Sequence, residues 1–340
     1  MRKELPLVDS PKTSHNLNGC LLAIILNNED NWNWFYSEYI QLRAYCLRNG
    51  DADLGLYKYG SRFDTIDEFD MPLYSEKIYP FNLKNQEDII KEFEMYIDNE
   101  FYPFVICDDY YISTMNIENH RAHDLLFYGY DNEEKIFLTF AFNGSKMQKF
   151  HVSYEDVIKA VFAEETRHEK RTNAFFKLKN KKYPLNLEKI KWHLLDYYEC
   201  VDTLSRERPW IKPQYKESWG LNVYENLKRK FIWTFGVQKN VSYAQMYLLY
   251  EHKKDMVGRI KYLKQHSNLS YTDEILAGFE EVERESLILV NQTIKLNTMR
   301  FEACERELDK ALIRIDNIRS IEKNAIEKYL NYNEAEFNKI

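Results

Sequence analysis

The stretch HDLLFYGYDNEEKIFLTFAFNG, residues 123–144, predicts the central feature of the fold. Its first apolar run ends at Gly129 and at Asp131-Asn132, residue types that favour turns. A second apolar run follows from residue 135 and ends at Asn143-Gly144. Two such runs separated by turn residues predict a β-hairpin. We therefore expect an antiparallel sheet, with His123 at the open end of the hairpin.

A polar segment near the N-terminus, SHNLNGC at residues 14–20, leads into the apolar run LLAIIL at residues 21–26. This pattern predicts a loop entering a buried helix, with Cys20 in the first turn of that helix. A thiol there faces unpaired backbone N–H groups and the positive end of the helix dipole, which favour the thiolate. With a protonated histidine nearby, such a position lowers the pKa of a cysteine from about 8.5 towards about 3.5–7.5.

The five cysteines are odd in number and widely spaced. No C-x-x-C pair and no Cys/His pair at zinc-ligand spacing is present, so we expect neither a disulfide framework nor a metal site. We interpret the other four as small buried apolar residues: Cys46, Cys107, Cys200 and Cys304. Cys20 opening a helix, followed about a hundred residues later by His123 opening a hairpin, is the chain order of papain-like thiol enzymes.

Residues 123–137 resemble the H-x-[apolar]-x-x-x-G-Y-D signature of the papain-fold bacteriocin-leader peptidases. They resemble more closely the H-type acyltransferases of butirosin biosynthesis. Three further segments are similar to segments of that group: PFVICDDYY at 103–111, SYED at 153–156, and WGLNVYE at 219–225. We also expect SYED to open a helix as a capping motif. The resemblance implies an α+β fold whose papain-like domain combines an N-terminal helix with an antiparallel sheet.

The expected domains are a papain-like catalytic domain over residues 1–165, a basic connector over 166–184 and a helical domain over 185–335. Apolar residues, Leu287 and Ile294 among them, recur at heptad-like spacing between Leu276 and Tyr329. This pattern predicts one long C-terminal helix or a helical hairpin, packed in a bundle on other helices such as residues 241–265. The pattern also allows a homodimer.

The resemblance implies an acyltransferase that forms an amide bond in secondary-metabolite (antibiotic-like) biosynthesis. The donor would be an acyl or peptidyl carrier protein, whose phosphopantetheine holds the acyl group as a thioester. Cys20 would take up the acyl group, and neutral His123 would then deprotonate a small amine acceptor. Thiolate attack on a thioester exchanges sulfur for sulfur, so it needs little electrophilic assistance. No cofactor beyond the substrate's phosphopantetheine is implied.

The supporting site residues depart from the pattern of papain-like enzymes. Where an Asn or Asp usually orients the histidine, this chain has Thr139, with Asn143 as the alternative one turn later. The usual oxyanion-hole glutamine is also absent. We expect Asn16 or Asn18 to donate to the oxyanion beside the backbone N–H of Cys20, and we favour Asn16.

Asp108 and Asp109 follow an apolar strand close to the histidine. They either bind a cationic amine acceptor or end the strand by forming a turn. Tyr110 and Tyr111 either line an acyl channel or pack as ordinary aromatic residues.

Charge and composition exclude several classes of protein. The first 150 residues carry 14 basic and 25 acidic side chains, and the remaining 190 carry 33 and 29. The acidic first part would repel phosphates, so we expect no nucleic-acid partner. No apolar run approaches the roughly 20 residues that span a bilayer, and the N-terminus lacks the apolar core of a secretory signal. We therefore expect a cytoplasmic protein without a membrane partner.

The most basic stretch runs from Arg167 to Lys182. It is either a docking surface for an acidic carrier protein or a solvated linker. Two other functions remain open for the chain: a cysteine peptidase that cleaves a leader peptide or amide, and a non-enzymatic binding protein with a degenerate papain-like domain.

Overall fold

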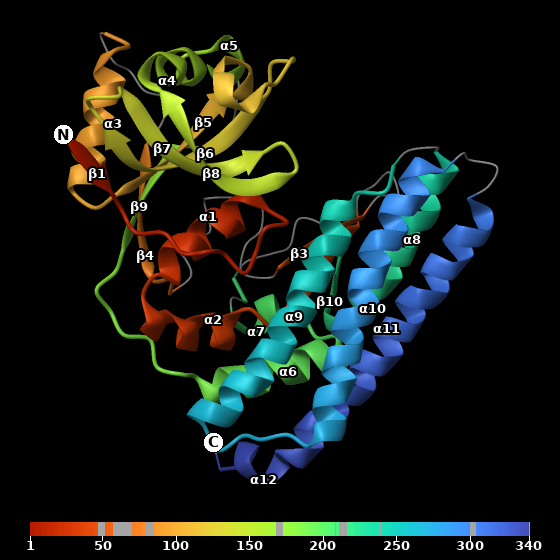
Figure 1. The fold of residues 1–340 in the computed structure, drawn as a ribbon. Helices are drawn as coiled ribbons and strands as arrows, with labels where there is room; N and C mark the ends of the chain where they lie inside the picture. The colour runs from red at the N-terminus through yellow and green to blue at the C-terminus, as the bar shows by residue number, and fades with distance from the viewer. Residues whose placement is uncertain are drawn as a thin grey trace. The chain divides into compact units, whose positions relative to one another are not determined.

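The chain folds into two compact units of α+β structure, with antiparallel sheets and long C-terminal helices (Figure 1). The first unit comprises Met1–Asn31 and Ser61–Tyr183, and the second comprises Trp32–Gly60 and Pro184–Ile340. The structure, a computed structural model, describes residues 1–46, 52–56, 70–78, 85–167, 173–207, 209–210, 216–237, 240–299 and 304–339. The α+β class predicted from the sequence is confirmed.

The first unit is built on an antiparallel sheet with the strand order β4-β9-β5-β6-β7-β8, and β1 pairs with β6 at the side of this path. Its strands are β1 (Arg2–Glu4), β4 (Leu73–Ile78), β5 (Tyr102–Asp108), β6 (Ala122–Asp131), β7 (Ile136–Asn143), β8 (Lys146–Ser153) and β9 (Asn173–Leu178). Strands β6 and β7 are the hairpin predicted from residues 123–144, so that prediction is confirmed. On the other side of β6, Cys107 of β5 pairs with His123.

Gly129 permits a close approach of strands at the far end of this hairpin. The β6–β7 register shifts between Phe127 and Gly129, and Gly129 pairs with Glu4 of β1. A Cβ atom at this position would lie 2.6 Å from the carbonyl oxygen of Lys3. The glycine of the G-Y-D sequence is therefore needed for β1 to join the sheet.

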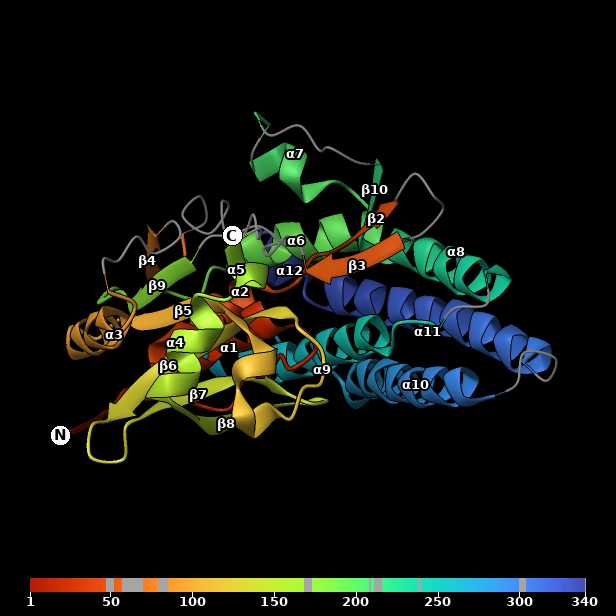
Figure 2. The same cartoon turned by 90° about the horizontal axis from the view of Figure 1, so that it is seen from above.

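Helices cover both faces of this sheet (Figures 1 and 2). Helix α1 (Asn16–Ile25) lies on one face against β6 and β7, whereas α3 (Asp88–Asp98) and α4 (Tyr154–Val161) lie on the other. Short elements complete the unit: α5 (Glu164–Arg167) and the 3-10 turns η1 (Glu29–Asn31), η3 (Asp109–Tyr111) and η4 (Ser113–Met115). The hydroxyl of Ser153 caps α4 by accepting from the N–H of Asp156, so the expected capping motif at 153–156 is confirmed.

The second unit combines a small antiparallel sheet, in the order β10-β2-β3, with a bundle of helices. The strands are β2 (Leu42–Cys46), β3 (Ala52–Leu56) and β10 (Lys216–Trp219). The helical elements are α2 (Trp32–Glu38), α6 (Leu187–Glu199), α7 (Thr203–Glu207), η5 (Gly220–Asn222), α8 (Val223–Gly236), α9 (Tyr243–His266), α10 (Asp273–Thr298), α11 (Glu305–Tyr332) and α12 (Glu334–Phe337). The predicted helix over 241–265 corresponds to α9, and α10 packs against both α9 and α11, as in a helical hairpin.

The buried seam of α10 differs from the predicted one. Leu287 and Ile294 were expected in the core, but they are 38% and 47% exposed. The buried positions next to them hold Ser286 and Thr293, whose hydroxyls donate to the carbonyl oxygens four residues earlier at 2.7 and 2.8 Å. Because these bonds satisfy the hydroxyls inside the helix, polar residues are tolerated in the seam.

The boundaries of the two units also differ from the expected domains. Residues 173–178 were expected in the connector, but they form β9, which pairs with β4 and β5 inside the first sheet. Residues 32–56 were expected in the catalytic domain, but α2, β2 and β3 belong to the second unit. Residues 168–172 of the expected connector lie outside the described residues.

Candidate functional site

Cys20 is sealed inside the first unit. It is the fifth residue of α1, so it stands in the second turn, and its side chain is fully buried. Its Sγ lies 3.5 Å from the carbonyl oxygen of Phe140 and 4.0 Å from Oδ1 of Asn16. Burial, and then the charge of Asp124, raise the pKa of the Cys20 thiol well above its ordinary value. The expected first-turn position and lowered pKa are therefore wrong.

Cys20 and His123 lie on opposite faces of the sheet. Side chains four residues apart along a strand share a face, so His123 points to the same side as Phe127. The Phe127 ring packs against Phe93 of α3, with 4.9 Å between ring centroids. Helix α1, which carries Cys20, covers the other face (Figures 1 and 2). The structure therefore does not bring the predicted nucleophile and base together.

The first residue of α1 is Asn16, and its side chain joins the ends of β6 and β7. Its Nδ2 donates to the carbonyl oxygen of Asp124 at 2.7 Å, and its Oδ1 accepts from the N–H of Phe142 at 3.3 Å. The amide that we expected to serve an oxyanion is thus engaged with strand backbone. Asn18 is also buried, and its Oδ1 has no hydrogen-bond partner among the described residues.

The two predicted orienting residues bond to backbone carbonyl oxygens. Thr139 is fully buried beside Phe127, and its hydroxyl donates to the carbonyl oxygen of Phe150 at 2.8 Å. Asn143 donates through Nδ2 to the carbonyl oxygen of Thr114 at 3.2 Å. The structure instead places a carboxylate near His123, because Oδ1 of Asp109 lies 3.9 Å from its Nδ1.

A cluster of acidic and basic side chains forms where β5 ends. Asp108 is fully buried there, and its Oδ1 accepts from the backbone N–H groups of Tyr110 and Arg121 at 3.1 and 3.0 Å. Its Oδ2 lies 2.6 Å from Nδ1 of His120. Burial raises the pKa of Asp108, but the hydrogen bonds from His120 and the two N–H groups outweigh burial and lower it overall.

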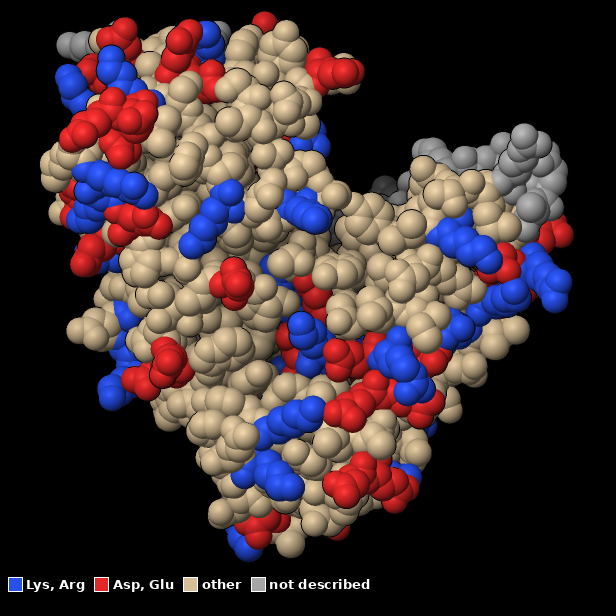
Figure 3. Space-filling view, viewed as in Figure 1, with Lys and Arg blue, Asp and Glu red and all other residues tan. Residues whose placement is uncertain are grey.

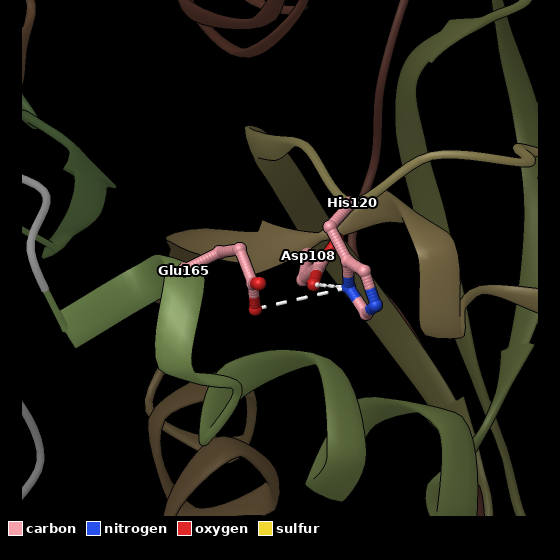
Figure 4. Close-up of side chains that lie close together, drawn as sticks. All are labelled: Asp108, His120 and Glu165. Carbon is pink, nitrogen blue, oxygen red and sulfur yellow. Dashed lines mark hydrogen bonds and ion pairs between the residues drawn. The ribbon is translucent and has the colours of Figure 1, made fainter.

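His120 faces a second carboxylate from another element (Figure 4). Nδ1 of His120 lies 3.7 Å from Oε2 of Glu165, which projects from α5. The hydrogen bond to Asp108 raises the pKa of His120. The imidazole packs against the rings of Tyr110 and Tyr111, with centroids 4.1 and 5.5 Å away. These tyrosines therefore hold His120 in place.

Asp109 forms the other half of this cluster. It is fully buried, and its Oδ2 accepts from Nε and Nη2 of Arg121 at 3.0 and 2.5 Å. Burial raises the pKa of Asp109 and outweighs the opposite effect of the Arg121 guanidinium. Asp108 also caps the turn η3, so the turn-forming alternative stated for this pair is seen directly.

Sequence reasoning did not single out His120, Arg121 and Glu165. The pairing of β5 with β6 indicates that His120 and Arg121 lie near the end of β5. If β5 and β6 pair antiparallel with Cys107 opposite His123, Asp108 and Asp109 must lie beside the segment 119–122. For Glu165 no such signal exists, because the position of the four-residue helix α5 depends on tertiary packing.

The lysines of the predicted docking surface that the structure describes lie in or just after β9, and most of them have an acidic neighbour. Lys177, Lys181 and Lys182 lie 3.4, 2.8 and 3.6 Å from carboxylate oxygens of Glu100, Asp70 and Asp30. Figure 3 shows basic and acidic side chains interspersed over the face in view. The described part of the predicted docking surface is thus less strongly basic than its sequence suggests.

A hollow of about 220 Å³ lies among described residues of the second unit. It is lined in part by Trp192, His193 and Arg206. Nε2 of His193 lies 2.7 Å from Oε1 of Glu207, and Arg206 pairs with Asp196. Both of these basic side chains therefore already have an acidic partner.

No protein-family profile matches the chain, and a search of curated proteins finds no significant match. Among the described helices, none has the length and apolar character needed to cross a membrane.

Proposed function

We propose that this chain is a binding protein built on a papain-like scaffold, and that it binds an acyl or peptidyl carrier protein without transferring the acyl group through Cys20. The burial of the Cys20 thiol carries this proposal. A thiolate, rather than a thiol, attacks a thioester, and a buried thiol of raised pKa supplies almost no thiolate at neutral pH.

Two further observations support a scaffold without thiol chemistry. The start of α1, where unpaired N–H groups would stabilise a thiolate, is occupied by Asn16, whose side chain has no nucleophilic group. His123 faces Asp109 on the other side of the sheet from α1. A peptidase would need the same thiolate, so these observations argue equally against leader-peptide cleavage. The carrier protein as partner rests on the resemblance of residues 103–137 to the butirosin-type acyltransferases.

A second candidate is the acyltransferase itself, which forms an amide through a Cys20 acyl thioester. One observation favours it: α1 packs against β6 and β7, the strands that carry His123 and Thr139. A helix bearing the thiol beside the strands bearing its partners is one part of the layout that papain-like chemistry requires. This candidate requires the thiol to become accessible when a carrier binds.

Mass spectrometry of the wild-type chain and Cys20→Ala, each mixed with an acyl-loaded carrier protein, separates the two candidates. Native spectra measure the complex, and denaturing spectra measure any covalent adduct. We expect both proteins to form the same complex and neither to gain the mass of the acyl group. An adduct on the wild-type chain that is lost in Cys20→Ala would establish the acyltransferase. Absence of any complex would overturn the carrier protein as partner.

A further inference from the structure

Three side chains from separate elements of the first unit converge on one point (Figure 4). Asp108 ends β5, His120 lies in the segment before β6, and Glu165 lies on α5. One oxygen or nitrogen atom of each lies within 4.8 Å of the corresponding atoms of the other two. These three residues are called the β5-edge triad below.

The triad is preorganised by its surroundings. Two backbone N–H groups fix Oδ1 of Asp108, which leaves Oδ2 directed at His120. The rings of Tyr110 and Tyr111 pack on the imidazole and restrict its rotation. Hydrogen-bonded carboxylates and restrained imidazoles are the outer-shell features that tune metal ligands in proteins.

The spacing of the triad suits a small divalent ion. Zn²⁺ binds imidazole nitrogen at about 2.0–2.1 Å and carboxylate oxygen at about 2.0–2.2 Å, so tetrahedral ligand atoms stand about 3.3 Å apart. The distances from Nδ1 of His120 to Oδ2 of Asp108 and to Oε2 of Glu165 are 2.6 and 3.7 Å, on either side of that value. Small side-chain rotations would make them equal.

The solvent exposure of the triad and the types of its ligand atoms also suit a divalent metal ion. The side chains of His120 and Glu165 are 41% and 37% exposed, while Asp108 is buried. An ion could therefore enter from solvent and keep a water in its fourth position, as zinc does with three protein ligands. One imidazole with two carboxylates is a mixed nitrogen and oxygen set that suits first-row divalent metals.

We propose that the β5-edge triad of Asp108, His120 and Glu165 binds a divalent first-row metal ion, with Zn²⁺ as the best fit. The ion replaces the proton shared between His120 and Asp108, and it ties α5 to the end of β5. The sequence predicted no metal site because the ligands are neither close together in the chain nor arranged in a known spacing.

The test is a calorimetric titration of Zn²⁺ into the full chain after treatment with a chelator. We expect one saturable site in the wild-type chain, weakened at least about tenfold in Glu165→Gln and in His120→Gln. Two substitutions serve as matched controls: Glu164→Gln on the same short helix, and His151→Gln at an exposed histidine of β8. Both controls should bind Zn²⁺ like the wild-type chain.

Thermal unfolding with and without Zn²⁺ provides a second measurement, because an ion that binds only the folded state raises Tm. Zn²⁺ should raise the Tm of the wild-type chain and the controls but not that of the two triad variants. Two results would overturn the proposal: no saturable binding to the wild-type chain, or equal binding by the triad variants. Either would mean that the triad is an ion-paired cluster only.

Discussion

The atoms around the sulfur of Cys20 determine what this residue can do. The thiol lies next to a backbone carbonyl oxygen and a side-chain amide oxygen, and near the charge of Asp124. Each of these disfavours a negative charge on sulfur, and no water reaches the buried side chain to offset them. Cys107, buried on β5, has its pKa raised by burial and by Asp109, Asp124 and Asp108. Both thiols therefore remain protonated at neutral pH.

Alkylation of the native chain tests this account of the thiols. We expect iodoacetamide at neutral pH to leave Cys20 and Cys107 unmodified, because alkylation requires an exposed thiolate. Cys200 is only half-buried, so it should react faster than either and serves as an internal comparison. Peptide mapping after a timed reaction gives the rates. Denaturant should make Cys20 and Cys107 reactive, and rapid alkylation of Cys20 in the folded chain would contradict the account.

Asn16 has a structural role that can be measured separately. Asn16→Ala leaves the carbonyl oxygen of Asp124 and the N–H of Phe142 without their partner. We expect it to lower the free energy of unfolding by about 1–3 kcal/mol. Asn18→Ala on the same buried helix is the matched control, and it should cost less because Oδ1 of Asn18 has no partner among the described residues. Urea unfolding measures the free energy of unfolding of both variants. Equal decreases in the two variants would refute the bridging role of Asn16.

At the scale of elements, a buried polar network holds the helices of the second unit together. Nζ of Lys253 on α9 bonds to Oε1 of Glu322 on α11 at 2.8 Å and to the hydroxyl of Tyr197 on α6 at 2.7 Å. Oε2 of Glu322 accepts from the hydroxyl of Tyr224 on α8 at 2.6 Å. Lys253 and Glu322 have no exposed side-chain surface. Lys253 and Glu322 thus stabilise one another's buried charge, and the two tyrosine hydroxyls add hydrogen bonds to them.

Removing one charge of this pair should be costly. Lys253→Met leaves Glu322 as an uncompensated buried carboxylate, and we expect a loss of about 3–5 kcal/mol in the free energy of unfolding. The double variant with Glu322→Leu should recover much of this loss, because no unpaired charge then remains. Lys254→Met, at the exposed neighbouring position, is the control and should change stability by less than about 0.5 kcal/mol. If the double variant lost the sum of the free energies of unfolding that the two single variants lose, Lys253 and Glu322 would not be a coupled pair.

The local sequence pattern predicted individual helices and strands better than it predicted which elements pack against one another. The β6–β7 hairpin, helix α9 and the capping serine of α4 follow from neighbours in the chain, and the structure confirms them. The position of residues 32–56 in the second unit could not be predicted, because contacts with distant helices decide it. The same limit applies to the site: Asp108 was identified from the end of its strand, but its approach to Glu165 depends on tertiary packing.

At the scale of the whole molecule, the net charge of −7 conceals a chain whose first 150 residues are acidic and whose remainder is slightly basic. The structure refines this division, because the lysines at the end of the first unit are paired with nearby carboxylates. Exposed ion pairs of this kind are weak, and a strongly acidic partner can compete for the lysines. The carrier protein of the proposed function would supply such a partner.

Charge reversal tests whether these lysines contact the carrier. If they do, changing Lys179, Lys181 and Lys182 to Glu should weaken carrier binding at least about tenfold at low salt, with a smaller effect at high salt. The control changes three exposed lysines of α9, Lys254, Lys261 and Lys264, to Glu and should leave the affinity unchanged. Binding isotherms at two salt concentrations provide the comparison. Equal affinities of the two triple variants would place the docking surface elsewhere.

The central claim is that the chain binds a carrier without chemistry at Cys20. The most direct test follows the loss of thioester from an excess of acyl-loaded carrier, with a simple amine present, over many equivalents of the chain. The account predicts that wild-type chain and Cys20→Ala leave the rate at the protein-free background. A wild-type rate well above background that falls to background in Cys20→Ala would contradict it.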